Sequence, residues 1–82
     1  MTDELPERLK RETKKWLEKV REERRKISTG KDGQEILDNI DAYTKDCHHF
    51  LEKNMPVEAF EAVIYAYGML DALKKLERKD VS

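Results

Sequence analysis

The segment from Pro56 to Leu76 restricts the possible folds of this chain more than any other, because its apolar residues are too many for one face of a helix. At about 100° per residue they cover roughly 240° of the circumference, whereas a helix that packs on a core needs a stripe only somewhat wider than about 100°. The apolar set consists of Val57, Ala59, Phe60, Ala62, Val63, Ile64, Ala66, Tyr67, Met69, Leu70, Leu73 and Leu76. Such a helix needs more than one neighbour, so we expect a packed all-α fold.

Two further segments carry apolar residues at helical spacing. The first helix is predicted over about 4–28, from a seam formed by Leu9, Thr13, Trp16, Val20 and Ile27. Within this seam we expect Trp16 to be mostly buried against the second and third helices. The second helix is predicted over about 33–53, from a stripe formed by Ile36, Leu37, Ile40, Tyr43, Cys47, Phe50 and Leu51.

Turn residues separate the three segments. Asp32, followed by Glu35, resembles a capping box that would open the second helix. Asn54 can adopt the left-handed conformation that closes this helix, and Pro56 opens the third helix, predicted over 56–78. Because connections this short make consecutive helices antiparallel neighbours, we predict a three-helix up-and-down bundle.

The length of 82 residues predicts one domain, 1–82, which buries roughly 60–65% of the surface of its unfolded chain. Cys47 is the single cysteine, so no disulfide forms within the chain, and a lone thiol suits a reducing compartment. The first residues are acidic, unlike a secretory signal, and no apolar run reaches the roughly 20 residues of a membrane span. We therefore expect a cytoplasmic protein with no membrane partner.

Basic residues concentrate in the first helix. From Glu7 to Lys26 the chain has ten Lys or Arg against five Glu, although its net charge is only −1. The candidate basic surface consists of Lys14, Lys15, Arg21, Arg24 and Arg25. These side chains could contact phosphates, but they are interleaved with glutamates in pairs such as Glu22–Lys26. The pattern therefore fits either a nucleic-acid surface or a solvated, ion-paired face.

The second helix contains the one cluster of residue types that bind metals, from Asp46 to His49. A metal site needs three or four converging ligands, whereas adjacent residues on a helix diverge. Asp46 and His49 are three residues apart and could meet, but they supply only two ligands. We assign no metal site, no cofactor and no catalytic residue, and keep Tyr43, Asp46 and His49 as candidate polar or interface residues.

The third helix contains a carboxylate, Asp71, on its apolar side. Buried carboxylates require partners, and Tyr67 or a nearby cation from Lys74 to Arg78 could supply one. We expect a polar contact that sets the register inside the bundle or at a dimer seam, with ligand binding as the alternative. Tyr65 lies nearer the polar side and is a candidate exposed contact residue.

Several motifs in the C-terminal half resemble a known family. They are Tyr43-x-x-Asp46-x-x-His49-Phe50-Leu51-Glu52, Ala59-Phe60-Glu61-Ala62, Tyr65-Ala66-Tyr67-Gly68 and Leu70-Asp71-Ala72. In these motifs the chain is similar to DUF357, a small archaeal domain-of-unknown-function family of short helical proteins, and the first helix is similar only loosely. The resemblance implies a three-helix bundle and no established activity.

The apolar excess of the third helix suggests a further partner, for which a second copy of the chain is the simplest candidate. We therefore expect a non-catalytic protein-interaction or scaffold module that forms a homo-oligomer through this helix. Another protein could cover the same surface instead. The alternative is a nucleic-acid-associated accessory protein that uses the basic first helix, and a metal-dependent or other enzyme is the third hypothesis.

Overall fold

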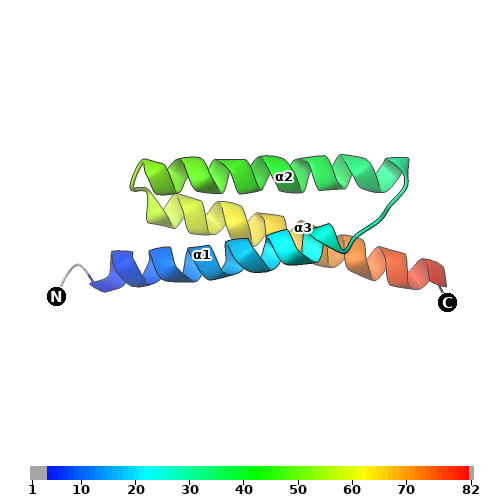
Figure 1. Cartoon of the computed structure of the whole chain (residues 1–82), viewed down its shortest axis with the longest axis horizontal. Coiled ribbons are helices and arrows are strands. Elements are labelled where there is room, and N and C mark those ends of the chain that lie inside the picture. The colour runs from blue at the N-terminus through cyan, green and yellow to red at the C-terminus, as the bar shows by residue number, and fades with distance from the viewer. Residues whose placement is uncertain (1–3, 82) are drawn as a thin grey trace.

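The computed structural model describes residues 4–81, with side-chain surroundings for 4–31 and 33–76. It contains three helices, α1 (Glu4–Arg25), α2 (Lys31–Glu52) and α3 (Pro56–Val81), and no strand in the described part of the chain. As Figure 1 shows, α1 and α3 run in the same direction and α2 runs against both. The predicted all-α three-helix bundle is confirmed.

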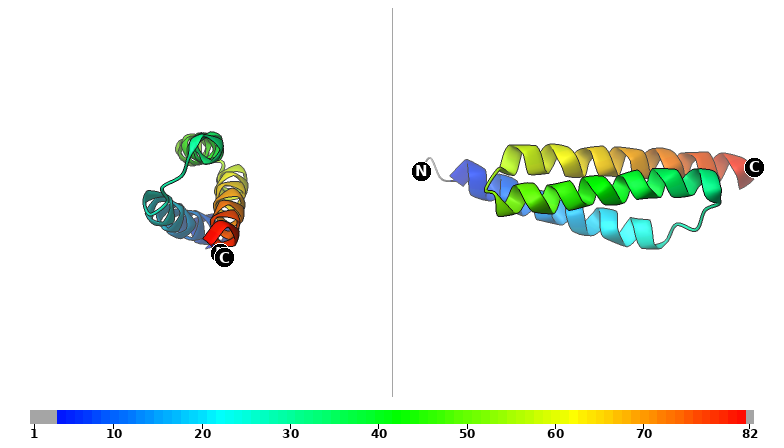
Figure 2. Two further views of the ribbon diagram at one scale, coloured as in Figure 1. Left: turned by 90° about the vertical axis from the view of Figure 1, so that its right-hand side faces the viewer. Right: turned by 90° about the horizontal axis from the view of Figure 1, so that it is seen from above.

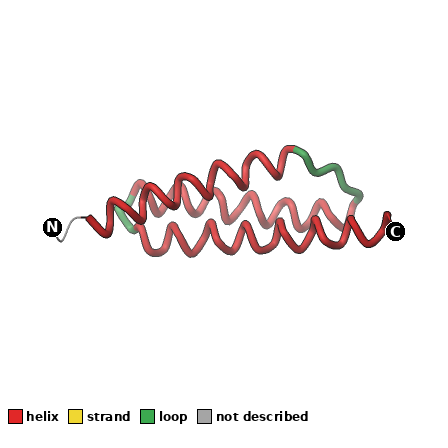
Figure 3. The backbone as a smooth tube through the Cα atoms, turned by 90° about the horizontal axis from the view of Figure 1, so that it is seen from below, coloured by secondary structure: helices red, strands yellow, loops and turns green. Residues whose placement is uncertain are grey.

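The helix boundaries differ from the prediction by up to three residues. α1 ends at Arg25 in a tight turn, in which the Ile27 N–H donates to the Arg24 carbonyl at 3.2 Å. α2 begins two residues early, at Lys31, and the connection before it is the longer of the two loops in Figure 3. α3 extends three residues past the predicted end, to Val81.

Of the two predictions for the ends of α2, the one for its start is wrong and the one for its end is confirmed. The predicted capping box is wrong, because the N-cap residue is Gly30, which has no side chain to cap the helix, and both Asp32 and Glu35 lie inside α2. Asn54 has φ 59°, the left-handed conformation expected after the helix. The Met55 N–H then donates to the Phe50 carbonyl at 2.8 Å, which closes the last turn.

The core lies where the three helices face one another, and α3 supplies the largest share. Its buried residues are mostly small, and they are Ala59, Ala62, Val63, Ala66, Leu70 and Leu73. α1 contributes Thr13, Leu17 and Val20, and α2 contributes Leu37, Ile40 and Cys47. The alanines of α3 allow both neighbours to approach closely, whereas α1 and α2 touch each other at few positions. Seen end-on in Figure 2, α1 and α2 flank α3.

Trp16 is only partly buried, so the prediction of a mostly buried indole is corrected. Its ring packs edge-on against Tyr67 of α3, with centroids 4.8 Å apart, and Lys19 Nζ lies 5.2 Å from the indole centroid. Leu17, which the predicted seam omits, is 5% exposed. Around the helix, Thr13 lies between Val20 and Leu17, and all three are buried. Trp16 lies about 40° beyond Val20, on the side away from Leu17, at the edge of the α1–α3 contact.

The helices in the described part of the chain all fall short of the length and apolar character that a membrane crossing requires.

Candidate interaction surface

One side of α3 is left uncovered by the other two helices. In the end-on view of Figure 2, α1 and α2 occupy two sides of α3, and no other element lies on the remaining side. We call this side the outer face of α3. Its residues are all exposed, and they are Val57, Glu58, Glu61, Ile64, Tyr65, Gly68, Ala72, Lys75 and Leu76. Six of these nine residues have no charge, and four of the six are large and apolar.

The four large apolar side chains on the outer face are well exposed. Val57 is 56% exposed, Tyr65 is 63% exposed and Leu76 is 54% exposed, while Ile64 retains 37% of its accessible surface. They are exposed because neither α1 nor α2 lies on that side of α3 (Figure 2). Several large apolar side chains exposed on one side of a helix are typical of a protein-interaction site.

Two candidate residues meet at the border between α2 and α3. The rings of Tyr43 and Tyr65 lie 5.8 Å apart, centroid to centroid, and are tilted by 32°. Both side chains are exposed, Tyr43 at 37% and Tyr65 at 63%. The spacing predicted Tyr43 on the apolar stripe of α2, but its side chain is exposed, and the ring pair depends on how α2 packs on α3. This aromatic pair extends the apolar surface beyond α3 itself.

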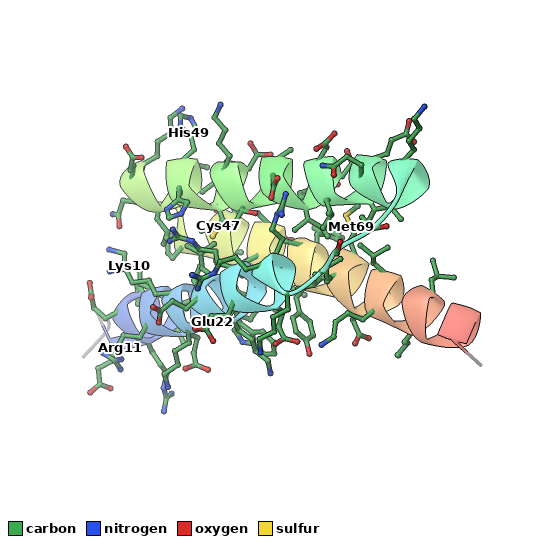
Figure 4. All side chains as sticks on the ribbon, turned by 45° about the vertical axis from the view of Figure 1, so that its right-hand side comes forward. Lys10, Arg11, Glu22, Cys47, His49 and Met69 are labelled. Atoms are coloured by element: carbon green, nitrogen blue, oxygen red, sulfur yellow. The ribbon has the colours of Figure 1, made fainter. Side chains whose placement is uncertain are left out.

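Asp46 and His49 lie apart from the outer face. Both are exposed on α2, where they line a shallow depression with Lys45, His48 and Glu52. In Figure 4 the His49 side chain points away from α3, while Cys47 lies on the side of α2 that faces it. In the part of the chain that the structure describes, no three His, Cys, Asp or Glu side chains are placed to share a metal ion.

Asp71 is not buried inside the bundle. Its side chain is 43% exposed, and its carboxylate lies 3.2 Å from Lys75 Nζ, one turn further along the same helix. Tyr67, its predicted neighbour, packs against Trp16 instead. Lys75 is one of the predicted partners, but it lies on the same helix, so this contact sets no register within the monomer. Asp71 is turned about 40° around α3 from Tyr67, away from the side that α1 covers. The side chain of Arg78, another predicted partner, lies outside the described residues.

The candidate basic residues divide between two places. Arg21, Arg24 and Arg25 line a groove of about 660 Å³ between α1 and α2, and Lys14 and Lys15 are exposed outside its lining. The groove is also lined by Lys45 and His48, and by three carboxylates, Glu18, Glu22 and Asp41. Charges of both signs therefore face each other across the groove.

Two of the groove arginines are already paired. Arg24 donates from Nε and Nη2 to the two carboxylate oxygens of Asp41, at 2.9 and 2.8 Å. This hydrogen-bonded pair raises the pKa of Arg24 further above its ordinary value and connects α1 to α2. Arg25 lies 3.8 Å from Glu22 on its own helix. The interleaved charges thus form ion pairs, but Glu22 pairs with Arg25 and Lys26 pairs with Glu23, in place of the predicted Glu22–Lys26 pair.

Glu23, which lies beside the apolar seam of α1, also has basic partners. Glu23 accepts a hydrogen bond from Lys74 of α3 and another from Lys26, and these hydrogen bonds lower the pKa of its carboxyl group. The Glu23–Lys74 pair connects α1 to α3 near the end of α1. It explains how a glutamate can lie beside the apolar seam.

Cys47 is buried and points into the core. Burial raises the pKa of its thiol to about 11, so the thiol is protonated at neutral pH. A protonated, enclosed thiol is a poor nucleophile and a poor metal ligand. Cys47 therefore acts as a small apolar core residue, next to Ile40 on the buried side of α2.

Comparison with known proteins extends the resemblance seen in the sequence motifs. A family model described as "Protein of unknown function (DUF357)" matches residues 8–78, and so covers most of α1 as well as the C-terminal half. No curated protein and no solved structure matches the chain.

Proposed function

This chain belongs to the DUF357 family of unknown function, and we propose that it is a protein-interaction module that self-associates through the outer face of α3. The observation that carries this proposal is the exposure of Val57, Ile64, Tyr65 and Leu76 on a side of α3 with no neighbouring helix. Complete burial of one such side chain is worth about 1.5–3 kcal/mol. Four of them on one face are a substantial driving force for association.

A second copy is the partner that we propose. α3 has 26 residues and is therefore about 39 Å long, which is long enough for two α3 helices to contact each other over several turns. The small residues Gly68 and Ala72 would let two backbones come close, and the exposed Tyr43–Tyr65 pair would widen the contact. A symmetric dimer is the commonest arrangement for such a self-complementary surface.

Light scattering across a range of micromolar concentrations tests the proposal. We expect a dimer or a higher oligomer, and we expect Ile64→Asn to shift the population toward monomer. Leu5→Asn is the matched control, because Leu5 is also exposed, at 69%, but lies in the first turn of α1. A protein that is monomeric at every concentration would contradict self-association. Equal effects of the two substitutions would contradict the assignment to α3.

A second candidate function is nucleic-acid binding in the groove between α1 and α2. It is supported by the clustering of Arg21, Arg24, Arg25 and Lys45 around one groove. The carboxylates in the same lining, two of which already pair with arginines, favour the first proposal. Affinity for mixed-sequence RNA or DNA at two salt concentrations separates the two functions, because phosphate contacts produce a steep dependence on salt. Arg21→Glu should abolish such binding and leave self-association unchanged.

A further inference from the structure

The outer face of α3 is arranged symmetrically about Gly68. Glu61 and Lys75 are each seven residues from this glycine, and Ile64 and Ala72 are each four residues from it. On a helix with about 100° per residue, these five positions fall within an arc of about 80° centred on Gly68. All five are exposed, whereas Ala59 and Leu70, which point in nearly the opposite direction, are buried.

Gly68 has no explanation within a single copy of the chain. Apart from the adjoining backbone of its own helix, a Cβ atom at this position would meet no atom within 4 Å, and the glycine does not have a positive φ. A glycine inside a helix lowers its stability relative to alanine, because the unfolded chain loses more conformational freedom. The absence of a side chain at an exposed position becomes useful when another backbone packs directly on it.

We propose that two copies of this chain pack α3 against α3 in antiparallel orientation, with a two-fold axis at Gly68. This geometry deepens the proposed self-association and depends on it. A two-fold axis at Gly68 brings each residue level with the residue equally far on the other side of the glycine in the partner copy. Ile64 then lies beside the partner's Ala72, so that a large side chain meets a small one on both sides of the axis.

The charges on the outer face favour the antiparallel orientation. About 10.5 Å from the axis, Glu61 of each copy lies level with Lys75 of the partner copy, within a small angular offset. In a parallel pair, the glutamates would face each other, and so would the lysines. Lys75 is 72% exposed beside Asp71, so its flexible side chain can reach a carboxylate on another chain. The dimer thus has an apolar centre between two opposite-charge pairs.

The rest of the bundle leaves room for this contact. On α3, Tyr67 and Lys74 mark the side toward α1, and Tyr65 marks the side toward α2. At about 100° per residue, the direction of Gly68 lies between these two sides, and Gly68 is exposed. A second α3 can therefore approach without displacing α1 or α2.

Exchange of the two charges tests the geometry. We expect Glu61→Lys alone and Lys75→Glu alone each to weaken self-association by more than about tenfold, because each change replaces two attractive pairs by two repulsive ones. A mixture of the two single variants should form a heterodimer, since one chain then presents two lysines and the other presents two glutamates. The double variant with both changes should again form a homodimer.

Other results of these experiments would overturn the proposed dimer geometry. Single variants that associate like the unchanged protein, or a mixture that does not associate, would overturn the antiparallel geometry while leaving self-association itself in place. An unchanged protein that is monomeric would overturn both proposals. Both charged residues are exposed, so thermal melting followed by circular dichroism should show that the variants remain folded.

A cysteine placed on the axis supplies a second measurement. Two residues on a two-fold axis meet their own copies, so Gly68→Cys should give a disulfide-linked dimer on mild oxidation. Ala42→Cys is the matched control, because Ala42 is exposed on α2 and away from the axis. The native Cys47 is buried and should not react in either protein. Equal cross-linking of the two variants would contradict the position of the axis.

Discussion

The two sides of α3 are both apolar, but they have different roles in the structure. The inner side packs Ala59, Ala66 and Leu70 against α1 and α2, with at most 1% of each residue exposed. The outer face exposes Ile64 and Tyr65, although these side chains are larger than the buried alanines. Burial in this protein thus follows the position of neighbouring helices and not the size of the apolar side chain. Apolar residues that remain exposed next to a complete core indicate a surface that packs against a partner molecule.

The largest expected difference between the two sides is in folding stability. Leu70→Ala on the inner side should lower the free energy of unfolding by about 2–5 kcal/mol, because it leaves a cavity in the core. Ile64→Ala on the outer face should change the unfolding of the monomer by less than about 1 kcal/mol. Chemical denaturation at a concentration where the protein is monomeric measures both values. Similar losses for the two variants would mean that Ile64 is covered within one copy.

The contact between α1 and α3 at the edge of the core should have an intermediate effect on folding stability. Trp16→Ala removes a partly buried indole that packs edge-on against Tyr67, so we expect a loss of about 2 kcal/mol in the free energy of unfolding. Trp16→Phe keeps an aromatic ring and should recover much of this loss. A melting temperature that does not change for Trp16→Ala would place the indole in solvent and weaken the assignment of the α1–α3 contact.

The core on which the inner side of α3 packs should also impose a pH dependence, through Cys47 of α2. The folded-state pKa of this thiol is raised to about 11 from an ordinary value of 9.0, because burial disfavours the thiolate. Its contribution to stability is therefore complete below the unfolded-state pKa and is lost as the pH rises toward the folded-state pKa. Between pH 8 and pH 10 we expect a loss of about 1 kcal/mol. The decline should be smaller by this amount in Cys47→Ala, which provides the comparison for other groups that titrate in this range.

The smallest expected effect, and the one that separates the two sides most sharply, is at Gly68. Gly68→Ala should stabilise the monomer by about 0.5–1 kcal/mol, because alanine favours a helix and its Cβ meets no atom within 4 Å apart from the adjoining backbone of its own helix. The same change should weaken self-association, since it adds a methyl group where two backbones approach. The free energy of unfolding, measured by denaturation, should therefore rise, while self-association, measured by light scattering, should become weaker. An increase in both monomer stability and self-association would show that no second chain packs on this glycine.

Local patterns in the sequence were sufficient for the helices and much of the core. The 3–4 spacing predicted that Val20, Ile40 and Cys47 would be buried, and they are, because each helix turns one stripe toward its neighbours. Asn54 predicted the end of α2, since few residues adopt a positive φ without strain. The capping box failed because the helix starts earlier, at a glycine that caps without a side chain.

The candidate site was less predictable than the fold. The prediction correctly selected helix three as having too much apolar surface, but the outer face could not be assigned, because both sides of this helix are apolar. Asp71 illustrates the difficulty. Its position beside Phe60 and Ile64 on the helix surface suggested burial, but the structure leaves that side exposed and pairs Asp71 with Lys75. The sequence pattern shows which residues share a face, and it does not show whether a neighbour covers that face.

By itself, the sequence determined three helical segments, the short connections that make consecutive helices antiparallel, and the symmetric spacing of Glu61 and Lys75 about Gly68. These features depend on backbone geometry and on distance along the chain, so they can be read locally. Only the tertiary structure decided that α3 packs against both other helices while α1 and α2 leave a charged groove between them. It also decided which side of α3 faces solvent. The physical reason is that coverage of a helix depends on the directions in which its neighbours approach, and residues far apart in the sequence set those directions together.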